Sequence, residues 1–421
     1  MIARIFIYLL LFITLPDYYL DRRFLRKRTR YLWWQRVLWW LPGAFMFFYT
    51  IFLATRRNFA PDNLLLLHLY LLLFGIMIVP KFLFSFCSFL GWAHCRYHHT
   101  HNNWGNLVGL LLGFGAVVAV AYGGTWGFRK VEVRHETYAS ADLPKAFDGY
   151  KIVHFSDAHL GTYGSSYADI PEKVVNLINA QQADMVVFTG DLQNMEPKEL
   201  YPFMQTLSRI KAKDGVFSVL GNHDYSMYID AESATKVANE RELISLQRQL
   251  GWDLLLNEHR TIRRGGDSIV VAGMENDGGK RFPKKGDIGK TLAGVQPGAF
   301  VLMLQHDPSS WRRTILPKSN AQLTLSGHTH AGQLKVFGWS PAAINYKEWG
   351  GMYNEGGRAI NVSYGMGGFI PFRLGASNEI VVITLKSGNK QTSTKHPTDT
   401  RPNPPQGREF DFLLMYNKMR N

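Results

Sequence analysis

The stretch YKIVHFSDAHLG, residues 150–161, joins a short apolar run to a polar cluster that carries Asp157 and His159. The same pattern returns four more times, in ADMVVFTGDLQ (183–193), GVFSVLGNHDYS (215–226), AFVLMLQHDP (299–308) and QLTLSGHTHAG (322–332). Helix-like segments separate several of these runs, at 171–180, 198–210 and 234–249. The alternation predicts an α/β domain, and short apolar runs of this kind are typical of strands that are buried on both faces.

Each of the five predicted strands ends in side chains that are common metal ligands. All of them are Asp, Asn or His, and together they are Asp157, His159, Asp191, Asn222, His223, Asp224, His306, His328 and His330. Ligands collect at the carboxyl ends of strands in open α/β sheets, and a mixture of imidazole and oxygen donors suits Mn, Fe, Zn, Co or Ni. Since these groups outnumber the four ligands of one zinc ion, we expect two divalent metal ions.

A structural explanation exists for each cluster taken alone. A single Asp at the end of a strand usually belongs to a turn, the segment GNHD (221–224) would suit an Asn/Asp turn, and His306 would suit a buried core position. Five clusters of one chemistry at five successive strand ends favour the metal site instead. The chain has two cysteines, Cys87 and Cys95, so its soluble part has neither a disulfide framework nor a cysteine-based zinc site.

The order of the clusters resembles the calcineurin-like metallophosphoesterase family. The blocks of that family are D-x-H, G-D, G-N-H-D/E, a lone His and G-H-x-H, and the chain carries them as Asp157–His159, Gly190–Asp191, Gly221–Asp224, His306 and Gly327–His330. The resemblance covers roughly residues 150–385, and the stretch SYGMGGFIPFRLGASNEIVVITL (363–385) is similar to the bacterial membrane-associated branch of the family. It implies an α/β fold, a four-layer αββα sandwich of two mixed sheets flanked by helices, preceded by an all-α transmembrane region.

The resemblance also implies which residues hold the two ions. The first ion would be held by Asp157, His159, Asp191 and His330, and the second by Asp191, Asn222, His306 and His328. The expected reaction is hydrolysis of a phosphodiester or a lipid-linked phosphoester by a hydroxide that bridges the ions. His223 would be the catalytic residue that stabilises the transferring oxygen or protonates the leaving group, and Asp224 would orient the other ring nitrogen of His223.

Other interpretations stay open at this stage. A non-catalytic metal-binding scaffold of the same fold is one alternative, and a nuclease is another. A role in substrate binding is no better supported than a structural role for Tyr225, Asn276, Asp277 and Arg373. The segment HCRYHHTHNN (94–103) has four histidines without a carboxylate, and a solvated loop explains it better than a metal site.

Residues 1–127 are predicted to form a membrane domain with three or four transmembrane helices. Apolar runs occur at 5–15, 37–54, 64–79 with an extension past Lys81, and 107–127. A span needs ~20 apolar residues, so the last three runs qualify. The first run is shorter, and we expect a span rather than a signal peptide because no small-x-small cleavage site follows it. Residues 128–149 are expected to be a linker, 150–386 the phosphoesterase domain, and 387–421 a polar, proline-rich tail.

The positive charge of the chain belongs mainly to this membrane region. Residues 1–136 contain 15 Lys/Arg and 5 Asp/Glu, which gives +10 of the formal net charge of +14. Because these charges flank apolar runs, the expected partners are the lipid bilayer and a phosphoester substrate, and no nucleic acid is expected. Seven basic residues between the first two runs predict a cytoplasmic loop, which places the domain after residue 127 on the non-cytoplasmic side.

Overall fold

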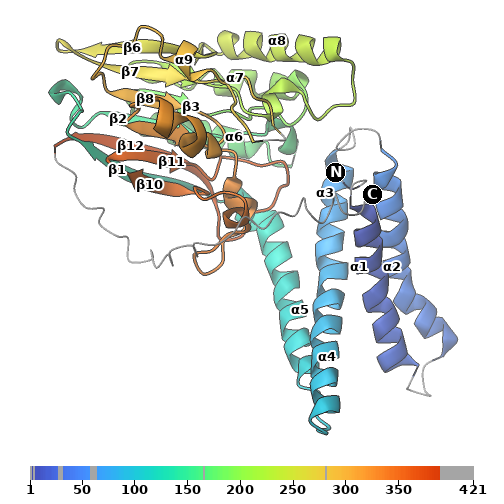
Figure 1. The fold of residues 1–421 in the computed structure, drawn as a ribbon. Helices are drawn as coiled ribbons and strands as arrows, with labels where there is room; N and C mark the ends of the chain where they lie inside the picture. Colours follow the sequence, from blue (N-terminus) through green and yellow to red (C-terminus); the bar gives the residue numbers. More distant parts are fainter. Residues whose placement is uncertain are drawn as a thin grey trace, which may run out of the picture.

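The computed structural model describes residues 2, 5–26, 32–56, 64–164, 166–279 and 282–388. These residues form a bundle of apolar helices and, at one end of the bundle, a two-sheet domain (Figure 1). The predicted C-terminal tail, 387–421, lies outside the described residues from position 389 onward.

The bundle consists of long apolar helices with short π-helical turns. Its elements are α1 (Phe6–Leu20), η2 (Asp21–Leu25), α2 (Trp33–Ala54), α3 (Leu64–Leu73), η3 (Phe74–Ile78), α4 (Val79–Tyr97), α5 (Gly105–Tyr122) and η4 (Gly123–Gly127). Within the described residues, three stretches are long and apolar enough to cross a membrane, namely Trp33–Ala54, Leu64–Tyr97 and Gly105–Gly127. Helix α1 packs against α2 and α4, and its own crossing of the membrane stays a prediction.

The helical stretch from Leu64 to Tyr97 continues past Pro80. The π-helical turn η3 ends two residues before this proline, and α4 begins with Pro80 in its first turn. The next residue, Lys81, donates from Nζ to Oδ1 of Asp17 in α1 at 2.8 Å. Both side chains lie mostly inside the bundle, so an ion pair joins α1 to α4.

The described part of the C-terminal domain contains two six-stranded sheets. The first sheet has the order β1 (Val131–Ser140), β12 (Asn378–Ser387), β2 (Lys151–Phe155), β3 (Met185–Phe188), β4 (Val216–Ser218), β5 (Asp253–Leu254). The second has the order β10 (Gly351–Glu355), β11 (Arg358–Val362), β9 (Leu323–Ser326), β8 (Val301–Leu304), β7 (Asp267–Gly273), β6 (Glu258–Arg264). Strands β2 to β4 are parallel, as are β7 to β9, and each sheet also has an antiparallel pair, so both are mixed.

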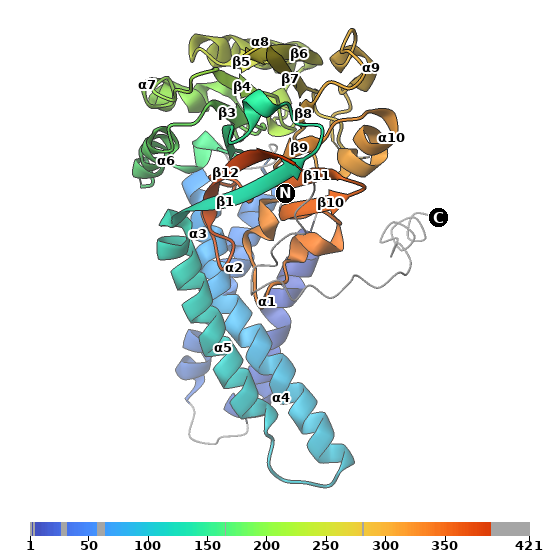
Figure 2. The ribbon, with the colours of Figure 1, turned by 90° about the vertical axis from the view of Figure 1, so that its left-hand side faces the viewer.

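Helices cover the outer face of each sheet. Figure 2 shows α6 (Asp169–Ala180) and α7 (Met204–Leu207) on one side of the strands, with α9 (Ile288–Thr291) and α10 (Leu316–Lys318) on the other. Between the sheets, Ile152 and Val187 of the first share a core with Leu302 and Leu323 of the second. The neighbouring Val153 points the other way, into the core beneath the helices, as the two-residue period of a strand requires. The predicted αββα sandwich is confirmed.

The segment 128–149, which was predicted to be a linker, contains the edge strand β1. This strand pairs in parallel with β12 along its whole length, from Val131 opposite Asn378 to Ser140 opposite Ser387. The linker prediction was wrong for 131–140 because this strand mixes charged and apolar residues (VEVRHETYAS), and eight of its ten residues are partly or fully exposed. It therefore lacks the continuous apolar run that marked the other strands, and only three residues separate it from η4.

Candidate metal centre

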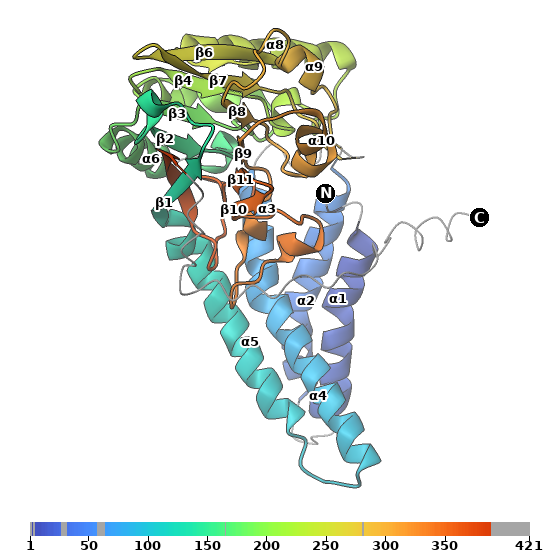
Figure 3. The same ribbon diagram turned by 60° about the vertical axis from the view of Figure 1, so that its left-hand side comes forward.

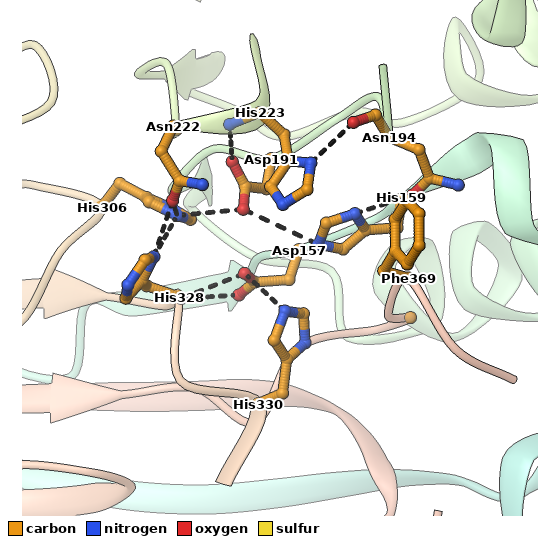
Figure 4. Close-up of polar contacts among 12 residues, drawn as sticks. Asp157, His159, Asp191, Asn194, Asn222, His223, His306, His328, His330 and Phe369 are labelled. Atoms are coloured by element: carbon orange, nitrogen blue, oxygen red, sulfur yellow. Dashed lines mark hydrogen bonds and ion pairs between the residues drawn. The ribbon is translucent and has the colours of Figure 1, made fainter. Parts of the chain in front are cut away.

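The five polar clusters meet where the carboxyl ends of the parallel strands of both sheets converge (Figure 4). The loops that carry them follow β2 (Asp157, His159), β3 (Asp191), β4 (Asn222, His223, Asp224), β8 (His306) and β9 (His328, His330). Parallel strands present their carboxyl ends at one edge of a sheet. Because the two sheets face each other, both deliver polar side chains to the same place.

The backbone at the cluster is held in an unfavourable conformation. Asp157, His159, Asp191, His328 and His330 all have positive φ values, between 47° and 73°. Such values are uncommon for residues other than glycine and tend to gather at functional sites. The glycines beside these residues allow close approach, since a Cβ added at Gly221 or Gly327 would collide with the carboxylate of Asp191 or Asp157, respectively.

The first group of ligand atoms belongs to Asp157, His159 and His330, with Asp191 beside it. The ligand atoms of the first three residues all lie within 4.8 Å of one another. His330 Nε2 is 3.5 Å from Asp157 Oδ1, and His159 Nε2 is 3.6 Å from Asp191 Oδ2. The backbone N–H of His328 donates to both oxygens of Asp157 at 3.0 Å, which fixes that carboxylate.

The second group consists of Asp191, Asn222, His306 and His328. His306 Nε2 lies 3.2 Å from Asp191 Oδ2, 3.2 Å from Asn222 Oδ1 and 3.2 Å from His328 Nδ1. Nδ1 of His306 donates to the carbonyl of Thr189 at 2.7 Å, so Nε2 is the nitrogen turned toward the cluster. Oδ2 of Asp191 therefore belongs to both groups.

These residues fit a pair of metal ions. One buried ring nitrogen that faces the cluster, His159 Nε2, has no hydrogen-bond partner among the described residues, and an unpartnered buried polar atom is costly. Nδ1 of His159 donates to Asn194 Oδ1 at 2.8 Å, which leaves Nε2 with a free lone pair in the neutral ring. The 3.2 Å spacings of the second group match those of ligands that each lie about 2.1 Å from one ion.

The charges of the cluster also favour a cation. Burial lowers the pKa of His159 to about 3 and that of His328 to about 4, so both imidazoles are neutral at pH 7. Burial acts on His306 in the same direction, but the nearby carboxylates of Asp191 and Asp157 outweigh it and raise its pKa to about 10. The carboxylates thus favour a positive charge between them, which a metal ion would supply in a loaded site.

Asp224 was expected to orient the ring of His223, and this prediction was wrong. Nδ1 of His223 donates to the carbonyl of Asn194 at 2.6 Å. The carboxylate of Asp224 instead accepts the backbone N–H groups of Gly221, Asp191 and Leu192 at 2.8 or 2.9 Å. His223 and Asp224 are consecutive in a 3-10 turn, where neighbouring side chains diverge. Asp224 consequently joins the loops after β3 and β4, and its effect on His223 is indirect.

Comparison with known proteins shows the family of the chain. Residues 150–332 match the family described as calcineurin-like phosphoesterase. The uncharacterized metallophosphoesterase YkuE of Bacillus subtilis is 32% identical over 295 residues, which cover 66% of this chain and 96% of that protein. The chain belongs to the calcineurin-like metallophosphoesterase family. Residues 3–128 match a second description, probable calcineurin-like phosphoesterase, transmembrane domain, so this metallophosphoesterase is an integral membrane protein.

Animals and bacteria both have relatives of this metallophosphoesterase. A transmembrane protein with metallophosphoesterase domain from Danio rerio is 30% identical over 253 residues, which cover 58% of this chain and 55% of that protein. The chain thus matches about half the length of this relative. Among solved structures, phosphopantetheinyl hydrolase from Mycobacterium tuberculosis is similar over 52% of this chain and 89% of its own, with 12% identity and a TM-score of 0.34.

Three side chains that contact the metallophosphoesterase cluster were not predicted from the sequence. They are Asn194, which accepts from His159; Tyr346, whose hydroxyl lies 2.7 Å from His328 Nε2; and Tyr228, whose hydroxyl accepts from Asn222 Nδ2 at 2.8 Å. The ring of Tyr228 also packs on that of His223, with 4.3 Å between centroids. The one sequence signal for Asn194 was its position three residues after Asp191. Both tyrosines stand outside the family blocks.

The four residues considered as substrate contacts all have structural partners. Arg373 is buried and donates to the carbonyls of His330, Gly367 and Ala376. Asp277 accepts from Ser310 and Thr314 and pairs with Arg313. Asn276 Nδ2 donates to the Pro283 carbonyl, and the Tyr225 hydroxyl contacts Glu275 and the backbone N–H of Asn276.

The histidine-rich segment 94–103 lies at the turn between α4 and α5, at the end of the bundle away from the sheets (Figure 3). The rings of His94 and His98 pack together with 4.5 Å between centroids, and His98, His99 and His101 are exposed. None of the metal-ligand groups found among the described residues includes these histidines. The candidate site therefore rests on the strand ends alone.

Proposed function

We propose that this protein is a membrane-anchored phosphoesterase that uses two divalent metal ions. The first would be held by Asp157, His159, Asp191 and His330, and the second by Asp191, Asn222, His306 and His328. The observation that carries the proposal is the position of Asp191 Oδ2, which lies 3.6 Å from His159 Nε2 and 3.2 Å from His306 Nε2. One carboxylate oxygen thus faces both groups, as a bridging ligand does.

Two ions at this site would neutralise the charge of a phosphoester and lower the pKa of a bound water to near neutrality. The chain itself orients the ligands for this task. The backbone N–H of His223 donates to Asp191 Oδ1 at 2.8 Å, which leaves Oδ2 turned toward the two groups. Asn194 and Thr189 accept from Nδ1 of His159 and His306, respectively, and so direct the Nε2 lone pairs of both rings inward.

His223 is proposed to act on the substrate rather than to bind a metal. Its Nδ1 is committed to the carbonyl of Asn194, so Nε2 is the nitrogen available at the cluster. Burial lowers the pKa of this ring, whereas the negative charge of a bound phosphoester would favour the protonated form. Protonated Nε2 would stabilise a phosphoryl oxygen or transfer its proton to the leaving group.

A lipid-linked phosphoester is the substrate class that the surroundings of the site favour. Met195, Tyr228, Ile229 and Phe369 of the phosphoesterase domain share one apolar cluster with residues of α1, α2 and α3. The ring of Phe369 lies 6.1 Å from that of His223, and its carbonyl lies 3.3 Å from Nε2 of His68 in α3. The metal centre therefore sits beside the end of the membrane bundle, close to where a lipid headgroup lies.

The non-cytoplasmic side is proposed for the catalytic domain. The basic residues Arg22, Arg23, Arg26 and Arg36 lie in or next to η2 and in the first turn of α2. The end of α1 that leads into η2 is the end of the bundle opposite the sheets (Figure 1). Because basic loops tend to stay in the cytoplasm, the sheets would lie across the membrane from them. Reporter fusions or protease protection at both ends of the bundle would test this orientation.

The activity test uses the full chain in detergent or lipid discs, loaded with manganese. Its substrates are a chromogenic phosphodiester, a phosphomonoester, a phospholipid, a nucleotide-linked lipid and fluorescent DNA and RNA. Asp191→Ala is the control, and His135→Ala on the edge strand β1 is a matched histidine substitution away from the site. We expect hydrolysis by the wild type and His135→Ala and none by Asp191→Ala. Equal behaviour of the wild type and Asp191→Ala would refute the proposal, and hydrolysis of nucleic acid in preference to lipid would identify a nuclease.

A further inference from the structure

Large apolar side chains of the phosphoesterase domain are exposed mainly in one short segment. Among the described residues from position 128 onward, the highly exposed ones are Tyr201, Val237, Val336, Phe337, Trp339 and Ile344. The last four fall within nine residues, and their exposed fractions are 43% for Val336, 104% for Phe337, 53% for Trp339 and 75% for Ile344. Single exposed apolar residues are common on proteins, but a contiguous group of them marks an interaction site.

The segment contains a tight hairpin with Phe337 at its tip. The backbone N–H of Val336 donates to the carbonyl of Trp339 at 2.9 Å, and the N–H of Trp339 donates back at 3.0 Å. Phe337 and Gly338 form the two-residue turn, with φ values of 49° and 81°. Such turns favour Asn or Gly at both positions, so the phenylalanine occupies the tip against the conformational preference of its backbone. Folding alone gives no reason for an aromatic ring there.

The base of this hairpin is level with the end of the last apolar helix. The backbone N–H of Lys335 donates to the carbonyl of Leu374 at 2.8 Å. The neighbouring Arg373 donates its backbone N–H to the carbonyl of Gly123, in η4, at 2.9 Å. From this level the segment that follows β9, drawn in orange, descends beside α5 and α4 (Figure 3). The hairpin thus extends from the sheets in the direction in which the helices cross the membrane.

We propose that Val336, Phe337, Trp339 and Ile344 insert into the leaflet of the bilayer on the side of the catalytic domain. Aromatic side chains are favoured at the boundary between headgroups and hydrocarbon. Lys335 and Lys347 stand on either side of the apolar group, and their positive charge suits anionic headgroups. The occupant is a bilayer because the helices of the same chain already hold a membrane at this level.

Insertion would also connect the lipid surface to the metal centre. The loop of His328 and His330 leads into the hairpin, and two residues after Ile344 the chain reaches Tyr346, whose hydroxyl contacts His328 Nε2 at 2.7 Å. A hairpin anchored in lipid would therefore hold the ligand loop at a fixed depth above the membrane. This inference does not depend on the proposed hydrolysis, because lipid contact can be measured without substrate or metal.

The test places an environment-sensitive fluorophore on the hairpin of the full chain in lipid discs. The fluorophore is attached to Phe337→Cys in a chain that also carries Cys95→Ser, because Cys95 is partly exposed whereas Cys87 is buried. The Cys95→Ser chain without Phe337→Cys shows how much label attaches elsewhere. Thr261→Cys, on an exposed position of β6 at the far end of the domain, is the matched control. Trp339→Cys provides a second position on the hairpin. Because the side chain of Phe337 is fully exposed, its replacement removes no packing inside the domain.

We expect a nitroxide near the top of the lipid acyl chain to quench about half or more of the emission at position 337, since interfacial elements lie roughly 5–10 Å into the boundary region. A water-soluble quencher should act on position 261 and spare position 337. Equal responses of the two positions would overturn the proposal. It would also be overturned if position 337 were shielded to the same degree in detergent and only at high protein concentration, because a second copy of the chain would then cover the hairpin.

Discussion

Nδ1 of His159 lies 2.8 Å from the side-chain oxygen of Asn194, and this contact directs the other ring nitrogen toward Asp191. The backbone carbonyl of the same asparagine accepts from His223 at 2.6 Å. Nδ2 of Asn194 donates to the hydroxyl of Thr162, which fixes the amide in the orientation that accepts from His159. One residue therefore positions a proposed metal ligand through its side chain and the proposed catalytic histidine through its backbone.

Replacing Asn194 by alanine should weaken metal binding, because the His159 ring loses the acceptor that sets its tautomer. Loss of such a supporting contact typically costs about 10–100-fold in metal affinity or activity. Asn194→Asp keeps an acceptor for Nδ1 and should restore most of the affinity. Manganese titration of both variants measures this, and equal affinities for Asn194→Ala and the wild type would contradict the role.

Replacing His223 by alanine should separate catalysis from metal binding. Since Nδ1 is committed to Asn194 and the residue is proposed to act on the substrate, we expect kcat to fall by about 10²–10⁴-fold. The metal content should stay at the wild-type level, whereas His306→Ala should lose metal. Elemental analysis together with kinetics distinguishes a residue that acts on the substrate from a metal ligand. A loss of metal in His223→Ala would show that His223 is a ligand.

The stability of the protein should respond to pH through Glu199. Burial raises the pKa of this carboxyl from 4.5 to about 7, although the backbone N–H groups of Asn194, Glu196 and Met195 act in the opposite direction. The folded chain then binds this proton more tightly than the unfolded chain does. Consequently, the contribution of Glu199 to stability is fully present below about pH 4.5 and declines as the pH rises to about 7.

Glu199→Gln provides the comparison, since glutamine does not titrate. The advantage of the wild type over this variant in Tm should shrink between pH 5 and pH 7. Thermal unfolding followed by tryptophan fluorescence across this range is the measurement. A difference in Tm that stays constant with pH would show that Glu199 titrates at its ordinary value.

The ion pair between Asp17 and Lys81 should be required for the stability of the helix bundle. Lys81→Met leaves a buried carboxylate without its partner, which costs about 3–5 kcal/mol in buried pairs of this kind. The double variant Asp17→Asn/Lys81→Met removes the unpaired charge and should recover most of that loss. Unfolding of each variant in detergent tests the coupling, and additive losses would show that the two side chains act independently.

The strand ends were predictable because each combines two local signals, a short apolar run and a following Asp or His, that need no knowledge of tertiary structure. Strand β1 was not predictable from the sequence, because an edge strand with one polar face resembles a linker. The hydrogen-bond partners of the proposed metal ligands were harder to predict. Whether Asp224 faces the ring of His223 or the amides of Gly221 and Asp191 depends on the direction of one 3-10 turn. The sequence names both residues but not the geometry of that turn.

In the membrane region, too, the helices were predictable from the sequence but their side-chain contacts were not. Its apolar helices follow from composition and length, and the sequence shows Lys81 as a charge beside an apolar run. Its partner Asp17 lies 64 positions away and is visible only once α1 packs against α4. The exposed hairpin was also hidden, because the four apolar residues of 336–344 look like an ordinary strand or core segment until their exposure is known.

The most direct test of the account is anomalous diffraction from crystals of the full chain grown with manganese. We predict two peaks about 3.5–4 Å apart, with the carboxylate of Asp191 between them, one peak beside His159 and His330 and the other beside His306 and His328. A single peak, or peaks that lie away from Asp191, would contradict the two-metal centre.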